Sequence, residues 1–463
     1  ILTNRFGGRP VGSDAYENAA EWVANEYRKW GLDVEMHLAG SVPVGFNRGA
    51  WFGRMFSGNE VTTLHFVTPS YTSGTKGLQR GRVLNEPRSQ QEFDSMKDAL
   101  KGAWVLIGGK SSGWAIDQSA KADARRDSLK ALNIDIAKQN AQKPNDSIRP
   151  LKEEPALFLR EMREAGILGI IQSAPVPLTA LYDRALVFDS TMTFERLPEL
   201  PDIKLDEHQY DIIKKMITDQ SVFELEFDIR NFFKPGPINY YSVTGKITGS
   251  EYPDEYVILS GHLDSFDAAT GAVDCGAGVT SVIEAARLVA MSGAKPKRTM
   301  LFIAFAGEEF GLLGAKAWTE TYAQKLDNIA NVFNRDGRQL APVKISAHSS
   351  AYKDFVTICE PLKSIRADFP FELKEIKDAP PRPTRTGGND ATVFALKGVP
   401  TITLEEEDVK GYNFDYREVW HTERDLYTKA IPEYQEHAAT VLAVCGLGVA
   451  NLDHLLSREG MYK

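Results

Sequence analysis

Cysteine is scarce in this chain. The three cysteines, Cys275, Cys359 and Cys445, form no C-x-x-C pair and lie far apart in the sequence. An odd and sparse set of this kind argues against a disulfide framework and against a zinc cage made of cysteine thiolates. We therefore expect each cysteine to be a small, buried, apolar residue.

Long apolar runs and long basic runs are also missing. No apolar stretch approaches the roughly 20 residues that a membrane-spanning helix requires, so we expect no membrane span in this chain. The net charge is −9, without a long block of Lys and Arg, which argues against nucleic acid as a partner. With 463 residues, of which 43% are apolar and 25% charged, the chain is typical of globular proteins with two domains.

From about residue 235 onward, continuous apolar runs alternate with helical patterns. Apolar runs without alternation are typical of strands that are buried on both faces, and their alternation with helices predicts a mostly parallel sheet. The fold class expected is therefore α/β, with a mixed sheet sandwiched by helices. The expected strands are 256–260, 299–305, 329–333 and 400–404, and the expected helices are 276–291, 310–321 and 431–447.

The first 61 residues include an amphipathic pattern at 14–30, which predicts a helix closed by Gly31. The character of the chain then changes to short apolar runs broken by turns, with a polar stretch at 110–154 that is helical in part. We therefore predict a discontinuous main domain, residues 1–61 and 206–463, with a smaller domain inserted at 62–205.

Ionisable side chains follow the predicted strands. His262 comes just after the strand 256–260, Glu308 and Glu309 follow the strand 299–305, and Asp336 follows the strand 329–333. Because ligands of open α/β sheets collect at the carboxyl ends of strands, we expect these side chains to converge. Two further candidates are Asp274, which opens the helix 276–291, and His421, near the C-terminal end of the sequence.

Two imidazoles and four carboxylates are what two zinc ions require: five ligands, one of them shared, and one carboxylate left free to act on water. On this interpretation Glu309 binds one zinc ion, and Glu308 is the general base. Asp264 fixes the tautomer of His262. Each residue has a simpler alternative: Asp274 as a helix N-cap, the two glutamates as a solvated turn, and each histidine as a structural residue.

Five segments, in this order, resemble the co-catalytic di-zinc metallopeptidases, family twenty-eight. That family contains bacterial aminopeptidases, plasma glutamate carboxypeptidase and folate hydrolase, with glutaminyl cyclases more distant. The opening segment RFGGRPVGSDAYENAAEWV is also similar, and the inserted region resembles a protease-associated domain. The five segments are GHLDS (261–265), GAVDCGAG (271–278), FAGEEFGLLGA (305–315), NRDG (334–337) and VWHTERD (419–425).

The resemblance implies a three-layer zinc-peptidase fold and a ligand set. One zinc ion would be held by His262, Asp336 and the bridging Asp274, and the other by Glu309, His421 and the same Asp274. Glu308 would take the proton from the attacking water, and Asp264 would orient His262. The chain departs from the family at Cys275, Arg335, Asn389 and Ala391, which puts the substrate preference in doubt rather than the metal site.

The expected function is a zinc-dependent exopeptidase acting on peptides, with an aminopeptidase favoured over a carboxypeptidase or dipeptidase. An aminopeptidase needs an acid for the substrate ammonium, such as Glu308 or the run 405–408. A carboxypeptidase needs a cation for the terminal carboxylate. A glutaminyl cyclase and a non-catalytic, receptor-like binding protein are the remaining alternatives. The candidate cations are Arg335, Arg338, Arg382 and Arg385.

The location expected from the resemblance is periplasmic or secreted, with a signal peptide already removed. The inserted domain would limit access to short peptides. The oligomeric state cannot be predicted from the sequence.

Overall fold

The computed structural model describes residues 1–142 and 148–463, which divide into two compact units. The first unit comprises Ile1–Ser41, Ile238–Trp420 and Arg424–Lys463, and the second comprises Val42–Pro237 with His421–Glu423. The second unit is wider than the predicted insertion 62–205. The reason is that two long strands, β1 (Asp33–Ser57) and β9 (Glu224–Ile247), contribute residues to both units.

The first unit contains a mixed sheet whose centre is parallel. Strand β10 (Tyr252–His262) pairs in parallel with β11 (Arg298–Phe305) on one side and with β12 (Ile329–Asn334) on the other. Residues 243–247 of β9 then pair antiparallel with β11. The prediction of an α/β fold with a mostly parallel, mixed sheet is confirmed.

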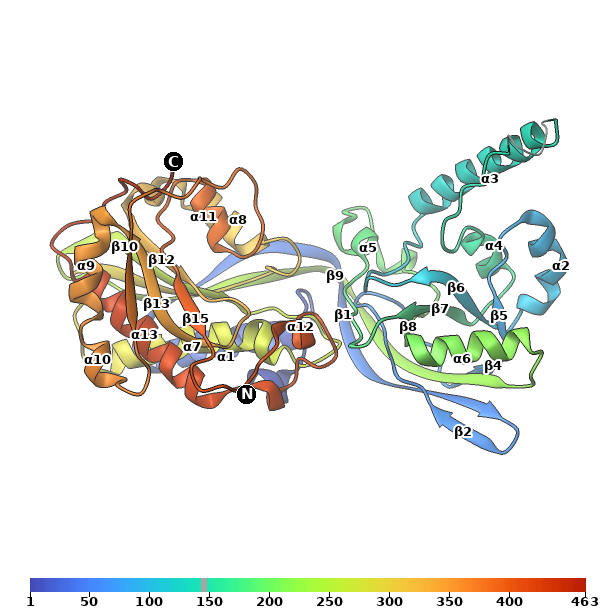
Figure 1. Ribbon diagram of the computed structural model, residues 1–463, viewed down its shortest axis with the longest axis horizontal. Helices are drawn as coiled ribbons and strands as arrows, with labels where there is room; N and C mark the ends of the chain where they lie inside the picture. The colour runs from blue at the N-terminus through green and yellow to red at the C-terminus, as the bar shows by residue number, and fades with distance from the viewer. Residues whose placement is uncertain (143–147) are drawn as a thin grey trace. The chain divides into compact units, whose positions relative to one another are not determined.

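Helices cover both faces of this sheet (Figure 1). On one face, Trp318 of α8 (Leu313–Thr321) and Phe394 of α11 (Ala391–Leu396) pack with Ile258 and its neighbours. On the other face, α7 (Gly278–Met291) and α13 (Pro432–Ala450) lie against β10 and β11. Gly446 of α13 sits so close to Leu259 that an added Cβ would come within 2.8 Å of it. The unit is therefore a three-layer sandwich.

Helix α1 (Asp14–Lys29) forms where the sequence predicted a helix. The hydroxyl of Ser13 caps it by accepting from the backbone N–H of Tyr16 at 3.0 Å. Its apolar positions are buried, and Gly31, with φ of 82°, ends it. The other elements of this unit are β13 (Ala341–His348), β14 (Glu372–Ile376), β15 (Leu404–Glu407), α9 (Ser349–Cys359), α10 (Leu362–Ile365) and α12 (Tyr416–Val419).

The predicted strand 400–404 is wrong. Pro400 has no N–H to donate to a sheet, although its carbonyl accepts from Val332 of β12 at 2.9 Å. The side chain of Asn331 then bonds to the backbone of Ile402, which replaces the regular ladder. Only the following residues form a strand, β15, and this strand pairs antiparallel with β13 in a separate three-stranded sheet.

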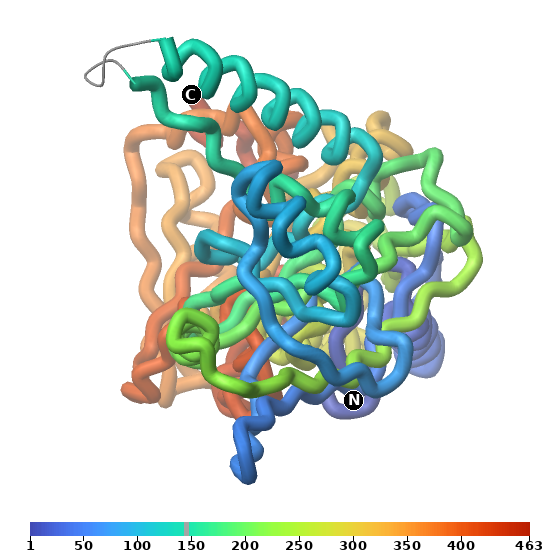
Figure 2. Tube along the Cα trace, turned by 90° about the vertical axis from the view of Figure 1, so that its right-hand side faces the viewer, coloured from blue at the N-terminus to red at the C-terminus, as the bar shows by residue number. Residues whose placement is uncertain are grey.

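The second unit has its own five-stranded sheet, in the order β3 (Phe66–Val67), β8 (Asp202–Asp206), β7 (Gly169–Ala174), β6 (Trp104–Lys110) and β5 (Val83–Asn85). Trp104 is fully buried in its core beside Phe227. Figure 2 shows α3 (Ala120–Asn140), in teal, as one long unbroken helix within the predicted polar stretch. The assignment of this unit to the protease-associated type stays a prediction. Two further strands, β2 (Glu60–Thr63) and β4 (Gln79–Gly81), pair with β1 and β9 respectively. The other helices are α2 (Gln90–Leu100), α4 (Leu159–Glu164), α5 (Arg184–Phe188) and α6 (Glu207–Thr218).

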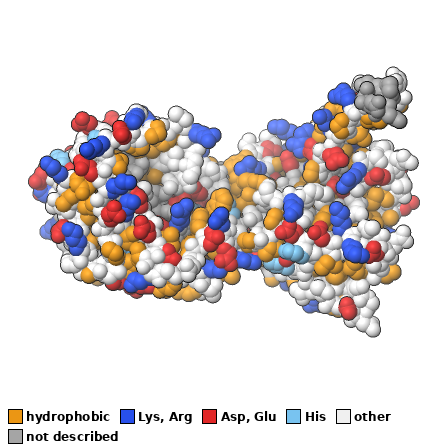
Figure 3. Space-filling view, in the orientation of Figure 1, with side chains coloured by type: hydrophobic (Ala, Val, Ile, Leu, Met, Phe, Trp, Pro, Cys, Tyr) orange, Lys and Arg blue, Asp and Glu red, His pale blue; other side chains and the backbone are white. Residues whose placement is uncertain are grey.

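Acidic and basic side chains are interspersed on the face drawn in Figure 3, without a broad patch of one sign. Within residues 1–142 and 148–463, every helix is too short or too polar to cross a bilayer.

Candidate metal centre

His262 is the last residue of β10, and its ring is buried. Its Nδ1 atom lies 3.0 Å from the backbone carbonyl oxygen of Asp264. A carbonyl can only accept, so Nδ1 carries the hydrogen and the lone pair of the neutral ring is on Nε2. The ring is therefore held in the tautomer that presents Nε2 to a metal ion.

Two carboxylates face this Nε2 atom. Asp274 Oδ1 lies 3.3 Å from it, and Asp336 Oδ1 lies 3.2 Å from it. A tetrahedral zinc ion with bonds of about 2.0–2.1 Å separates its ligand atoms by roughly 3.3–3.4 Å. Each of the two carboxylates thus lies at the distance from Nε2 that two ligands of one zinc ion have. Glu309 joins them, because ligand atoms of His262, Asp274 and Glu309 lie within 4.8 Å of one another.

The turn that carries Glu308 and Glu309 is held by Asp264. Its Oδ1 accepts from the backbone N–H of Glu308 and its Oδ2 from that of Glu309, both at 3.1 Å. The same carboxylate lies 3.7 Å from Nδ1 of His262, which is beyond a good hydrogen bond. Asp264 therefore orients His262 through its carbonyl, while its carboxylate positions the two glutamates.

The gathered acids raise one another's pKa. Burial raises the pKa of Glu308 to about 11 and raises the pKa values of Glu309 and Asp336 as well, with nearby carboxylates adding to the effect. Burial alone would lower the pKa of His262, but its acidic neighbours, Cys275 and Asp336 foremost, raise it well above its ordinary value. The site therefore disfavours its own negative charge, and a divalent cation would relieve this.

The loop that carries Asp274 is anchored from two sides. The carboxylate of Asp425 accepts from the backbone N–H of Val273 at 2.6 Å and from that of Asp274 at 3.0 Å. Arg9 is fully buried, and its guanidinium donates to backbone carbonyls at the start of this loop, before the loop and in the N-terminal segment. The acceptors are Leu263 at 2.7 Å, Thr270 at 3.0 Å, Gly271 at 3.1 Å and, in the N-terminal segment, Gly7 at 2.8 Å.

His421 is the fifth predicted ligand. It belongs to the short segment 421–423 that is part of the second unit, where Thr422 pairs with Thr179 and Glu423 N–H donates to Leu178. Within the first unit, the structure brings together the other four predicted ligands, and the role of His421 stays a prediction.

Arg335, a candidate for binding a substrate carboxylate, pairs with Glu406, which belongs to the acidic run that is a candidate for binding a substrate ammonium group. Arg335 is buried, and its guanidinium donates to the carboxylate of Glu406 at 2.5 Å and to the carbonyl of Leu340 at 3.0 Å. Each residue thereby loses much of its capacity to bind a substrate terminus. Arg338 and Arg385, in contrast, are exposed.

Sequence reasoning missed several residues at this site. Arg9 and Asp425 stand inside the quoted motifs, but neither motif gives a sign of what its charged group would bind. Asp390 lies in the segment GGNDATVF. Both of its carboxylate oxygens are buried without a hydrogen-bond partner among the described residues, and burial raises its pKa well above the ordinary value. An acid directly before the mostly apolar run 391–396 was the available signal.

Residues 242–445, which contain all five predicted metal ligands, match the model of peptidase family M28. This part of the chain is therefore similar to the M28 metallopeptidases, the family that its motifs resemble.

Its relatives include carboxypeptidase Q of Rattus norvegicus, 27% identical over 270 residues, which covers 57% of this chain and 52% of that protein. A probable zinc metalloprotease of Pyrenophora tritici-repentis is 39% identical over 134 residues, or 26% of this chain and 30% of that protein. The chain thus matches only about half the length of its carboxypeptidase Q relatives.

Two solved structures share the fold. A peptidase M28 precursor from Shewanella amazonensis superimposes with a TM-score of 0.59 at 20% identity, covering 98% of this chain and 92% of that one. A zinc aminopeptidase from Bacillus subtilis gives a TM-score of 0.54 at 15% identity, covering 100% and 95%.

We predict that Arg9→Met destabilises the first unit. The substitution removes the donor to several buried carbonyls, at about 1–3 kcal/mol for each group left unsatisfied, so the free energy of unfolding should fall by at least about 3 kcal/mol. Thermal unfolding followed by circular dichroism measures the effect. Arg5→Met, at an exposed position of the same N-terminal segment, is the control. Equal midpoints for the two variants would show that Arg9 does not anchor the loop.

Proposed function

We propose that this protein is a zinc-dependent exopeptidase that hydrolyses terminal peptide bonds, with aminopeptidase activity as the first candidate. The observation that carries the proposal is the position of Asp274 Oδ1 and Asp336 Oδ1 at 3.3 and 3.2 Å from His262 Nε2, beside the Glu308–Glu309 turn. The match of residues 242–445 to peptidase family M28 supports the reaction class.

The donor set fits two zinc ions that share Asp274. His262 and Asp336 would hold one ion, and Glu309 and His421 the other. Nitrogen and carboxylate donors suit zinc, and three ligand carboxylates offset most of the charge of two divalent ions. Bound zinc would supply a Lewis acid for the peptide carbonyl and lower the pKa of water.

Glu308 would act as the base because it is not needed as a ligand. Its carboxylate accepts a proton from the attacking water and passes it to the nitrogen of the leaving amine. Without cations, burial raises the pKa of Glu308 to about 11, so its carboxylate would be protonated at neutral pH. The base is therefore active only when positive charge beside it lowers this pKa.

Carboxypeptidase activity is the second candidate, and the similarity to proteins named carboxypeptidase Q favours it. This activity needs a cation for the substrate carboxylate. Arg335 is paired with Glu406, so the candidates that remain are Arg338, Arg382 and Arg385. A periplasmic or secreted location is proposed as well, on the family resemblance.

Glu308→Gln and Glu309→Gln should affect different quantities, the first the turnover number and the second the zinc content. The first removes the base and should lower kcat about 10²–10⁴-fold at unchanged zinc content. The second removes a ligand and should lower the zinc content per chain. Peptide hydrolysis and metal analysis by mass spectrometry measure the two quantities, with Glu320→Gln, on the exposed side of α8, as the control. Normal turnover by Glu308→Gln would reject its role as base, and peptides left intact by the zinc-loaded wild type would reject the proposed activity.

Blocked peptides separate the two exopeptidase candidates. An aminopeptidase must bind a free ammonium group, so it should cleave C-amidated peptides and leave N-acetylated ones intact. We expect this result, measured by chromatography of the products. Turnover of N-acetylated peptides without turnover of C-amidated ones would instead establish the carboxypeptidase.

A further inference from the structure

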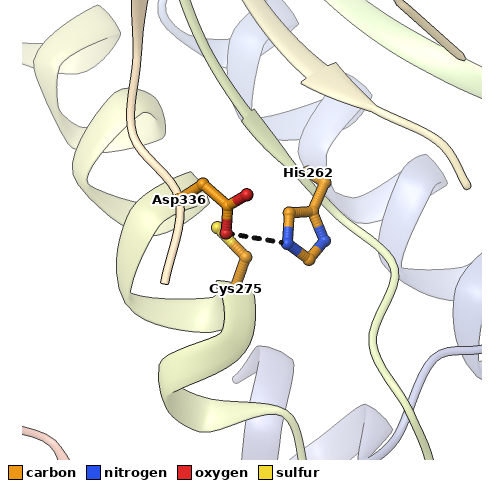
Figure 4. A group of neighbouring side chains, drawn as sticks. All are labelled: His262, Cys275 and Asp336. Atoms are coloured by element: carbon orange, nitrogen blue, oxygen red, sulfur yellow. Dashed lines mark hydrogen bonds and ion pairs between the residues drawn. The ribbon is translucent and has the colours of Figure 1, made fainter. Parts of the chain in front are cut away.

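Cys275 lies beside the metal centre rather than in the apolar core. It follows Asp274 directly, in the segment Ala272–Ala277 that precedes α7, and it is fully buried. Its Sγ atom, a ring nitrogen of His262 and a carboxylate oxygen of Asp336 all lie within 4.8 Å of one another. Figure 4 shows the three side chains converging from three different elements.

The other two cysteines are placed differently. Cys359 of α9 and Cys445 of α13 are buried next to each other, with their sulfur atoms 3.9 Å apart, between helices. They fit the expectation of small apolar core residues. Cys275 departs from that expectation, because its neighbours are a histidine and an acid.

The group is small enough to close around a single metal ion, because His262 Nε2 and Asp336 Oδ1 are 3.2 Å apart and Sγ lies within 4.8 Å of both residues' ligand atoms. With bonds of about 2.0 Å to nitrogen or oxygen and 2.3 Å to sulfur, a tetrahedral zinc ion holds such donors roughly 3.3–3.6 Å apart. The Sγ atom makes a long contact to the carbonyl oxygen of Arg335, at 3.4 Å. A thiol hydrogen bond of this kind is weak, so exchanging it for a metal bond costs little.

We propose that Cys275 is a further ligand of the metal ion held by His262 and Asp336, so that this ion has nitrogen, oxygen and sulfur donors. The proposal deepens the proposed function and rests on its metal site. On binding, the thiol loses its proton to solvent and the thiolate forms the bond to the metal. A thiolate favours zinc, cobalt and cadmium over magnesium and manganese, so the site should select the softer ions.

Cobalt substitution tests the proposal. A thiolate bound to Co²⁺ gives an intense near-ultraviolet charge-transfer absorption that nitrogen and oxygen ligands do not give. The chelator-treated full chain, loaded with Co²⁺ alone, should show this band. The double variant Cys359→Ser/Cys445→Ser, in which Cys275 is the single remaining cysteine, should keep it. Cys275→Ser should lose it while still binding cobalt.

Two results would overturn the proposal: cobalt-loaded wild type without the band, or a band that persists in Cys275→Ser. The double variant assigns the sulfur even where Cys275→Ser fails to fold. The outcome is separable from that of the proposed function. A band without peptide hydrolysis supports the ligand and contradicts the activity, whereas hydrolysis without a band does the reverse.

Discussion

The structure depends on one electrostatic constraint: several acids are buried around one histidine. Asp274, Glu308, Glu309 and Asp336 cannot all be ionised in this environment, because burial and mutual repulsion disfavour the charged forms. Divalent cations bound here, as proposed, would reverse this preference by turning each carboxylate into a ligand or an ionised neighbour. Metal binding is therefore coupled to the loss of protons, and the metal-loaded protein should be the more stable form.

The surrounding structure keeps these acids in place by binding their backbone. Asp264 accepts from the N–H groups of the Glu308–Glu309 turn, Asp425 accepts from those of the Asp274 loop, and Arg9 donates to carbonyls that flank it. None of these supports uses the side-chain oxygens that face His262. These hydrogen bonds hold the donors near one another without involving an ion.

Much of the site could be predicted from the sequence because the sheet is parallel at its centre. His262, Glu308, Glu309 and Asp336 each follow an apolar run, and parallel strands bring such ends to one edge. Residues that act over long sequence separations could not be predicted. Arg9 meets Leu263, and Asp425 meets Val273, only because the chain folds back on itself. No local sequence pattern predicts either contact.

Two further limits have physical reasons. The run 400–404 looks like a strand, but Pro400 and Asn331 break its ladder, which only the tertiary structure shows. The domain boundaries were predicted from changes in composition, whereas the long strands β1 and β9 continue across the boundaries between the two units.

Diffraction at the zinc absorption edge, from crystals grown with zinc, tests the central claim most directly. The account predicts two anomalous peaks roughly 3.5–4 Å apart, as in other two-metal sites, one of them bonded to His262 and Asp336 and both bonded to Asp274. A map without a peak at His262, with the four carboxylates turned away from one another, would contradict it.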